Sequence, residues 1–100
     1  MVVNGLMTLV IYDISDDRLR GRLAEYLRQY GLEHIQYSGF MGRLNANDRH
    51  VLVREVKRFI GGPRDSIYVV PLCNRCLSLL RIVSKDVRGV DEKGEVEVVE

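Results

Sequence analysis

The stretch LVIYDISDDRLRGRLAEYL, residues 9–27, runs from an apolar segment through a short acidic turn into an arginine-rich segment. Residues 7–13, MTLVIYD, are almost continuously apolar and rich in β-branched and aromatic side chains, which is typical of a buried strand. Ser15, Asp16 and Asp17 then supply the side-chain oxygens and negative charge that favour a helix N-terminus. The stretch therefore predicts a strand followed directly by a helix.

The predicted helix has one apolar side. Its apolar residues fall within an arc of roughly 100°, the width of a stripe that faces a core. They are Leu19, Leu23, Tyr26, Leu27 and Tyr30. Gly31 follows as a C-terminal cap, because glycine readily adopts the left-handed conformation that ends many helices.

The remaining chain repeats this alternation of strands and a helix. Residues 32–44 predict two short strands or one bent hairpin through Ser38 to Gly42. Asn47 and Asp48 begin a second helix that Gly61, Gly62 and Pro63 end. Its expected inner face comprises Val51, Leu52, Val56, Phe59 and Ile60. Residues 65–72 predict a strand, residues 76–83 fit a helix or a strand, and residues 95–99 alternate as a strand does.

The predicted order β-α-β-β-α-β is that of an α+β, ferredoxin-like fold with an additional C-terminal strand. We expect one domain over residues 1–100, in which residues 91–100 form an acidic C-terminal strand or tail. Two helices would cover one face of the antiparallel sheet and leave the other without a layer. We therefore expect a homodimer.

Composition and charge narrow the function classes. Hydrophobic residues make up 46% of the 100-residue chain, and no apolar run approaches the ~18 residues of a membrane span. The N-terminus lacks the basic region of a signal peptide, so a cytoplasmic protein with no membrane partner is expected. Residues 43–81 hold eight Lys or Arg against three acids, and residues 91–100 hold five acids and one Lys. This asymmetry fits either a nucleic-acid surface or ordinary solvated faces.

Asp13 is the acidic residue that folding explains least. An aspartate at a strand-to-helix junction is often a turn or capping residue, but Ser15, Asp16 and Asp17 already provide such groups. Mg²⁺ usually takes one or two carboxylates with water and phosphate completing its shell. A two-fold dimer could bring two Asp13 carboxylates together at its axis, where a divalent ion would activate water against a phosphodiester.

Basic residues follow Asp13 on both predicted helices. Arg18, Arg20, Arg22 and Arg28 lie on the first helix, and arginines beside a metal carboxylate suit phosphate binding. A basic stripe opposite the apolar face of the second helix comprises His50, Arg54, Lys57 and Arg58. Such stripes bind phosphate backbones without reading sequence, although each set could equally be a solvated helix face.

The cysteines and histidines form no complete site. Cys73 and Cys76 make a single CxxC, which is half of a zinc site; it also fits a redox motif, structural thiols or a local disulfide. His34 and His50 lack the spacing of a metal pair. Phe40, between Gly39 and Met41, reads as a core or interface residue.

Several segments together resemble a known family. VIYDISDDRLRGRLAEYLRQYGLEHIQYSGFMG and DSIYVVPLCNRC occur in the order and spacing found in the small CRISPR-associated adaptation protein, the ferredoxin-like partner of the spacer integrase. The resemblance covers about residues 7–98. It implies a homodimer that associates with integrase subunits, and an endonuclease dependent on Mg²⁺, or alternatively Mn²⁺, that acts on RNA or double-stranded DNA.

The resemblance also implies site residues. The metal-binding, catalytic aspartate matches Asp13, the tyrosine before it matches Tyr12, and the arginines after the turn match Arg20 and Arg22. The aromatic residue of the hairpin turn matches Phe40, and His34 stands where some members have arginine. The family usually begins near Met7, so residues 1–6 are an extension or a different start.

Three functions are compatible with these residues. In the first, a symmetric metal site between two Asp13 side chains cleaves phosphodiesters. In the second, the dimer is a non-catalytic scaffold that holds DNA on Arg18, Arg54, Lys57 and Arg58 and bridges integrase subunits. In the third, the chain is a ferredoxin-like regulator or toxin-like nuclease outside CRISPR systems.

Overall fold

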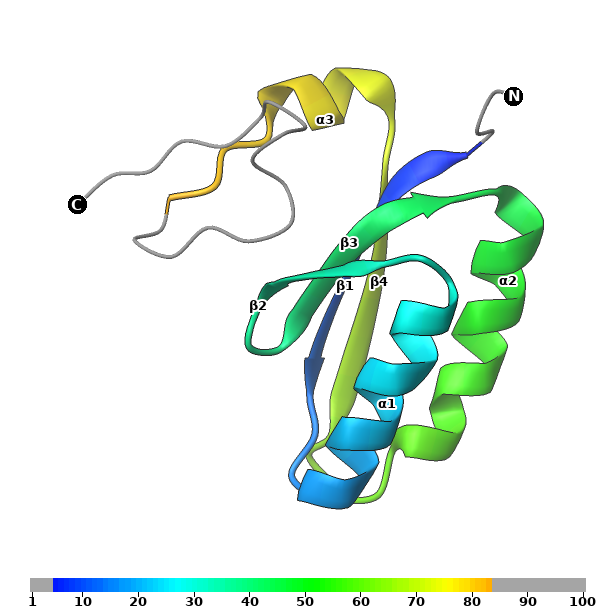
Figure 1. Ribbon diagram of the computed structural model, residues 1–100, viewed down its shortest axis with the longest axis vertical. Helices are drawn as coiled ribbons and strands as arrows, with labels where there is room; N and C mark the ends of the chain where they lie inside the picture. The colour runs from blue at the N-terminus through cyan, green and yellow to red at the C-terminus, as the bar shows by residue number, and fades with distance from the viewer. Residues whose placement is uncertain (1–4, 84–100) are drawn as a thin grey trace.

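The computed structural model describes residues 5–83, which form one four-stranded sheet with helices on both of its faces. In chain order the elements are β1 (Leu6–Asp13), α1 (Asp17–Gln29), β2 (Glu33–Gln36), β3 (Gly39–Leu44), α2 (Ala46–Glu55), the 3₁₀ helix η1 (Val56–Phe59), β4 (Ser66–Leu72) and α3 (Asn74–Leu79). All neighbouring strands are antiparallel, in the order β2-β3-β1-β4. The predicted ferredoxin-like arrangement is confirmed (Figure 1).

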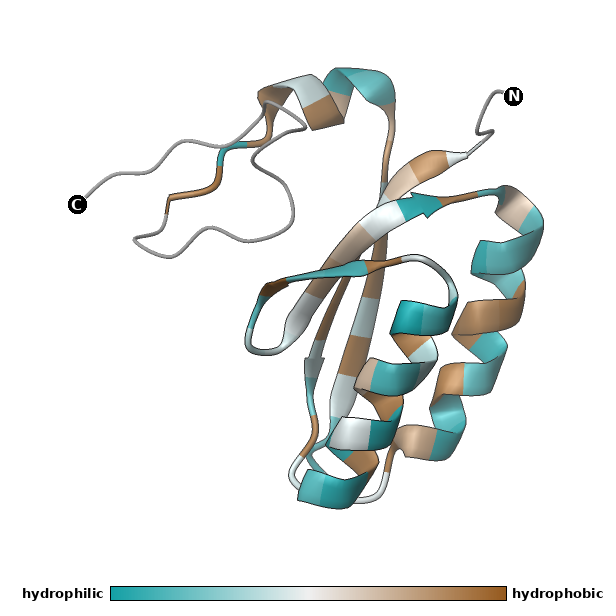
Figure 2. Cartoon of the chain, viewed as in Figure 1, coloured by the Kyte–Doolittle hydropathy of each residue, from teal (hydrophilic) through white to brown (hydrophobic). Residues whose placement is uncertain are grey.

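The main core lies between the sheet and the helices α1 and α2. Val10 and Tyr12 of β1 and Phe40 of β3 pack in this core, and Val10 and Phe40 are fully buried. The helices contribute Leu23, Leu27, Leu52, Val56 and Phe59. In Figure 2 both helices carry alternating hydrophobic and hydrophilic bands, as expected of helices with one buried face.

The second face of the sheet is only partly covered. Met7 and Met41 form a smaller cluster there with Leu77, Leu80 and Ile82, which come from α3 and the segment after it. In Figure 1, α3 lies at the opposite end of the molecule from the β1–α1 turn. Ile11, Tyr68 and Val70 remain 38%, 62% and 36% exposed. The predicted uncovered face is therefore covered at one end by a helix that the sequence left ambiguous.

Capping residues define the ends of α1. The Asp16 Oδ1 atom accepts hydrogen bonds from the backbone amides of Arg18 at 2.8 Å and Leu19 at 3.0 Å. Gly31 follows the helix with a φ of 84°, a left-handed conformation, and its amide donates to the Arg28 carbonyl at 2.9 Å. The predicted N-terminal and C-terminal signals of this helix are both confirmed.

The second helix differs in detail from its prediction. It begins at Ala46, because the Asn45 Oδ1 atom caps it by accepting from the Asp48 amide at 2.7 Å. The regular α-helix ends at Glu55 and tightens into η1. A 3₁₀ turn advances about 120° per residue and an α-helix about 100°, so residues after the change leave the original face. Ile60, predicted to be inside, is 40% exposed.

Two predictions concern the ends of the described range. Of residues 76–83, only those up to Leu79 are helical, and residues 80–83 have no regular structure. The strand predicted at residues 95–99 and the tail at 91–100 lie outside the described residues. Among residues 5–83, no helix is long and apolar enough to cross a membrane.

Candidate functional site

Asp13 is the last residue of β1 and lies opposite Ser66 of β4. Side chains alternate between the faces of a strand, so Asp13 shares the second face with Met7, Leu9 and Ile11. Its side chain is exposed. Within residues 5–83, no group of three His, Cys, Asp or Glu side chains is placed to hold a metal ion. One chain therefore offers this carboxylate as, at most, part of a metal site.

Tyr12 lies on the opposite face of the same strand, in the main core. It is 3% exposed, and its ring stacks on that of Phe40 with centroids 6.3 Å apart. Its backbone amide donates to the Ser38 carbonyl at 3.1 Å, which ties the end of β1 to the β2–β3 turn. Burial raises the pKa of the Tyr12 hydroxyl, and the positive charges of Arg20 and Arg28 partly offset this shift.

Phe40, the other aromatic site residue, is completely buried beneath this cluster. The His34 ring lies over it with centroids 4.0 Å apart, and the Arg28 guanidinium carbon is 5.7 Å from its centroid. Phe40 therefore packs against the rings of both Tyr12 and His34. Its position indicates that it orders the site by packing, and a direct role in catalysis stays a prediction.

A groove opens above Tyr12, between α1 and the β2–β3 hairpin, and we call it the α1–hairpin groove. Its volume is about 230 Å³, and its lining comprises Tyr12, Asp17, Arg20, Gly21, Ala24, His34 and Tyr37. Arg20 is held in place because its Nη1 atom donates to the Ile14 carbonyl at 2.6 Å and its Nη2 atom pairs with Asp17. Its guanidinium carbon lies 5.7 Å from the centre of the Tyr37 ring.

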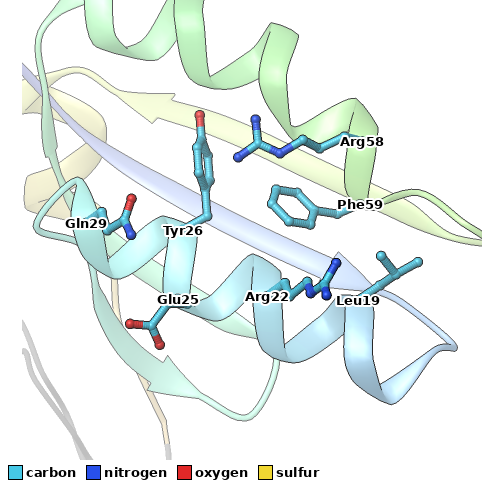
Figure 3. A pocket seen from close by; sticks show the side chains of 7 residues that line it. All are labelled: Leu19, Arg22, Glu25, Tyr26, Gln29, Arg58 and Phe59. Carbon is cyan, nitrogen blue, oxygen red and sulfur yellow. The ribbon is translucent and has the colours of Figure 1, made fainter.

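A second groove, which we call the α1–η1 groove, separates α1 from η1 (Figure 3). Its volume is about 320 Å³, and its lining comprises Leu19, Arg22, Glu25, Tyr26, Gln29, Arg58 and Phe59. Arg22 and Arg58 come from different elements and flank Phe59 in this view. The fold thus brings together two arginines that lie 36 positions apart in the sequence.

Aromatic packing orders the α1–η1 groove. The Arg58 guanidinium carbon lies 4.8 Å from the Tyr26 ring centroid and 4.9 Å from that of Phe59. The Tyr26 hydroxyl donates to Glu55 Oε1 at 2.7 Å. Burial, followed by hydrogen bonds to Tyr30 and Glu55, raises the pKa of Tyr26, so this hydroxyl stays protonated. Arg58 is therefore presented on a rigid aromatic support.

The other predicted nucleic-acid contacts are exposed on the helices. Arg18 lies in the first turn of α1, Arg54 lies in α2 and Lys57 in η1. Together with Arg22 and Arg58 they belong to the helical layer, whereas Asp13 belongs to the second face of the sheet. The predicted site residues therefore divide into two groups on opposite faces.

Asp65 is a residue that the sequence reasoning missed. Its carboxylate accepts four hydrogen bonds, from Ser15 N and Oγ at 3.0 Å each, from Gly61 N at 2.9 Å and from Gly62 N at 2.8 Å. The bonds from Gly62, Gly61 and Ser15 lower the pKa of Asp65 to about 2. A Cβ on Gly62 would lie 2.9 Å from Ser15 Oγ, so this close approach needs glycine. The turn after Asp13 is thus joined to the loop before β4.

A sequence signal for Asp65 did exist, because an aspartate two residues after the loop residues Gly61, Gly62 and Pro63 is a typical loop hydrogen-bond acceptor. Tyr37 and Gly21, which line the α1–hairpin groove, were also missed. Neither has a motif that could have identified it.

Cys73 and Cys76 are both exposed, free thiols near the start of α3. A hydrogen bond from the Cys76 backbone amide lowers the pKa of the Cys73 thiol. The pair lies at the end of β4, and within residues 5–83 no metal-binding group includes it. The zinc, redox and structural interpretations of this CxxC stay predictions.

Comparisons with known proteins agree with this architecture. Residues 6–79 match the family model described as CRISPR associated protein Cas2. The chain is 50% identical over 90 residues to the CRISPR-associated endoribonuclease Cas2 1 of Archaeoglobus fulgidus, covering 89% of this chain and 96% of that protein. It is 31% identical over 85 residues to a CRISPR-associated endonuclease Cas1/endonuclease Cas2 fusion of Thermoproteus tenax, covering 84% of this chain and 32% of the fusion.

A solved structure supports the same assignment. The crystal structure of a hypothetical protein from Thermus thermophilus superimposes with a TM-score of 0.64 at 31% sequence identity, covering 71% of this chain and 85% of that one. The family match spans every element from β1 to α3. It includes Asp13 and all the arginines of both grooves. The chain therefore belongs to the CRISPR-associated protein Cas2 family.

Proposed function

We propose that the protein acts in CRISPR adaptation as a homodimeric, metal-dependent endonuclease in which Asp13 is the catalytic carboxylate. The observation that carries this proposal is the exposed position of Asp13 at the end of β1, beside an uncovered part of the sheet. The names of the relatives support the reaction class, since the Archaeoglobus fulgidus protein is called an endoribonuclease.

A dimer through the second face would complete the site. Ile11, Tyr68 and Val70 form an exposed apolar strip on this face, and Ile11 and Tyr68 are opposite each other in the β1–β4 register. Exposed apolar strips of this kind often mark protein interfaces. Because a two-fold interface presents each residue twice, pairing through this strip would place both Asp13 carboxylates at one interface.

The residues present fit Mg²⁺ only as a shared site. A single Asp13 supplies one carboxylate, while two copies supply the hard oxygen ligands that Mg²⁺ prefers, with water and phosphate as further ligands. Mn²⁺ would accept the same oxygen ligands. When bound, the ion would lower the pKa of a coordinated water and stabilise the charge on the phosphate.

Other residues of the chain would position the substrate. Arg20 is held rigidly by Ile14 and Asp17, and Arg22 and Arg58 flank the α1–η1 groove. Guanidinium groups suit phosphate oxygens because they donate paired hydrogen bonds. Asp65 would keep the turn after Asp13 in place through its bonds to Ser15. Asp13 is thus the proposed catalytic residue, and Asp65 a positioning residue.

The test is a comparison of wild type with Asp13→Asn and Asp13→Ala on single-stranded RNA and on duplex DNA, with Mg²⁺, Mn²⁺ or EDTA. We expect both variants to lose cleavage while their far-UV circular dichroism and melting temperature stay near wild type, because the exposed Asp13 makes no core contact. Glu33→Gln, an exposed acid on β2, is the matched control and should cleave normally. Wild-type cleavage by purified Asp13→Ala would contradict the proposal.

A non-catalytic scaffold is the second candidate function. The Thermoproteus tenax fusion, which joins a Cas1 endonuclease and a Cas2 endonuclease in one chain, favours a partnership with integrase subunits. In this case the basic helical layer would hold DNA, and Asp13 would be dispensable. Spacer acquisition assays of Asp13→Asn separate the two candidates, since a scaffold retains acquisition without cleavage.

A further inference from the structure

Cys73 and Cys76 are the only two cysteines of the chain, and neither the proposed nuclease site nor the basic residues of the helices use them. Both thiols are free and exposed at the junction between β4 and α3. A cysteine that only fills space is usually among the most buried residues of a protein. Two exposed thiols three positions apart therefore call for an explanation other than packing.

The backbone holds the two cysteines at the two ends of one helical turn. Cys73 is the N-cap residue of α3, and Cys76 follows within the helix. The Leu77 amide donates to the Cys73 carbonyl at 2.8 Å, which closes this turn. Helix geometry separates the Cα atoms of positions i and i+3 by about 5 Å. A disulfide spans Cα atoms that are roughly 4.4–6.8 Å apart, so the turn has the right dimensions for one.

The two thiols differ in acidity. Hydrogen bonds from the Cys76 backbone amide and from the Cys76 thiol lower the pKa of the Cys73 thiol. The hydrogen bond to Cys73 and the charge of its thiolate raise the pKa of the Cys76 thiol. α3 contains Arg75 and no acidic residue, so its own sequence does not oppose a negative charge on sulfur. Because the thiolate is the nucleophile, Cys73 is the group that attacks first.

We propose that Cys73 and Cys76 form a reversible dithiol–disulfide site that exchanges with low-molecular-weight disulfides, with Cys73 as the attacking and Cys76 as the resolving group. The Cys73 thiolate attacks one sulfur of the oxidant, forms a mixed disulfide and expels one thiolate. Cys76 then loses its proton, attacks the Cys73 sulfur and expels the second thiolate, and both leaving groups take up protons. The two cysteines lose two protons and two electrons in total, and one oxidant disulfide becomes two thiols.

The disulfide acts on the part of the protein that covers the second face of the sheet. The cysteine pair lies between Leu72 and Leu77, which both pack in the smaller cluster on that face. A bond between the two sulfurs closes a ring around the first turn of α3, so this turn opens less often. Oxidation therefore makes α3 a firmer cover over one end of the second face.

The first test treats the reduced full-length protein with oxidised glutathione and follows its intact mass. We expect each wild-type chain to lose two hydrogen atoms, to retain no glutathione and to release two molecules of reduced glutathione. Dithiothreitol should restore both thiols. Glutathione retained on the wild type, or disulfide-linked dimers on a non-reducing gel, would overturn the proposal. Thiols that react only after EDTA treatment would also overturn it, since a metal ion would then hold the two sulfurs.

Serine variants separate the two roles. Cys76→Ser should trap glutathione on Cys73, because the resolving thiol is absent, and Cys73→Ser should acquire glutathione several-fold more slowly. Equal or reversed rates would refute the assignment of the attacking group. The double variant, Cys73→Ser with Cys76→Ser, is the matched control and should stay unmodified. Both side chains are exposed, so the circular dichroism of all variants should match wild type.

Hydrogen exchange measured by mass spectrometry tests the effect on α3. The Leu77 amide should exchange several-fold more slowly in the oxidised wild type than in the reduced wild type, while α1 stays unchanged. The double serine variant should show no difference after the same treatment. Identical exchange in oxidised and reduced wild type would contradict the effect on α3. Asp13→Asn should behave as wild type in every arm, so a failure of the proposed nuclease function is distinguishable from a failure of this proposal.

Discussion

Asp65 shows how much one side chain can organise near a site. A single carboxylate satisfies three backbone amides and one hydroxyl, and it joins Ser15 to a loop 50 residues away in sequence. All four donors favour the charged form, which explains why the pKa lies at about 2, below the usual value of 3.8. This residue therefore couples the conformation of the β1–α1 turn to pH.

We expect Asp65→Asn to lower the melting temperature near neutral pH by several degrees. Because the folded-state pKa is depressed, the stabilisation is present above about pH 4 and is lost as the pH falls towards 2. Thermal unfolding of wild type and variant from pH 2 to pH 7 measures this. The difference should shrink towards zero at pH 2, and a constant difference across the range would contradict the assignment. Glu33→Gln serves as the exposed-acid control.

Gly21 gives a prediction of opposite sign at the same scale. Replacing it with alanine should stabilise the fold by about 0.5–1 kcal/mol, because alanine loses less backbone entropy in a helix and the site has room for a methyl group. Urea denaturation at pH 7 measures the change. Gly31→Ala is the contrasting variant, since its φ of 84° disfavours alanine and should destabilise the protein. Destabilisation by Gly21→Ala would mean that the helix cannot accept even a Cβ there.

At the scale of elements, α2 and η1 form a basic surface on an apolar support. Arg54 and Lys57 are exposed, whereas Arg58 also packs over Tyr26 and Phe59. Removing the charge of Arg58 therefore affects packing as well as binding. The change from α-helix to 3₁₀ helix at Val56 alters the direction of the last turn, and it places Arg58 at the α1–η1 groove opposite Arg22.

We expect Arg54→Gln with Lys57→Gln to weaken duplex DNA binding about equally for unrelated sequences. Each lost phosphate contact should flatten the slope of log affinity against log salt by about one unit. Fluorescence anisotropy from 50 to 200 mM salt, a range in which such slopes are well resolved, measures both effects. Arg64→Gln with Arg75→Gln is the charge-matched control, from the loop before β4 and from α3. Unchanged binding would indicate that duplex DNA binds elsewhere on the protein, at Arg18, Arg20 and Arg22.

At the scale of the whole molecule, the two faces of the sheet differ in how completely they are covered. The helical face buries its aromatic and aliphatic residues, while part of the second face leaves Ile11, Tyr68 and Val70 exposed beside Asp13. α3 and residues 80–83 cover only the Met7 and Met41 end. This uneven covering is the structural reason to expect association through the second face.

We expect Tyr68→Lys to convert a dimer into a monomer at micromolar concentration, because it places a charge in the apolar strip. Sedimentation velocity measures the change. Val53→Lys is the matched control, because Val53 is 45% exposed on α2, away from this face, and should leave the dimer intact. A wild-type protein that sediments as a monomer under these conditions would contradict the dimer and, with it, the shared metal site.

The sequence by itself determined the order of the strands and of the two longer helices from β1 to β4. Strand β1 follows from the alternation of its side chains, and the buried side of α1 follows from i to i+4 spacing. The caps of α1 at Asp16 and Gly31 depend on groups a few residues apart. All of these signals involve residues that are close together in the sequence. The same local signals identified Asp13 as an unexplained carboxylate and the arginines as candidate phosphate ligands. The resemblance to the Cas2 family added Tyr12 and Phe40.

Only the tertiary structure decided which of these residues share a surface. Tyr12 and Asp13 are neighbours in sequence, yet strand alternation places one in the core and the other on the opposite face. Asp65 reaches Ser15, and Arg58 faces Arg22, through contacts between residues distant in sequence, which no local pattern encodes. The α1–hairpin groove likewise exists only because β1, α1 and the hairpin pack together and leave the space beside Gly21 unfilled.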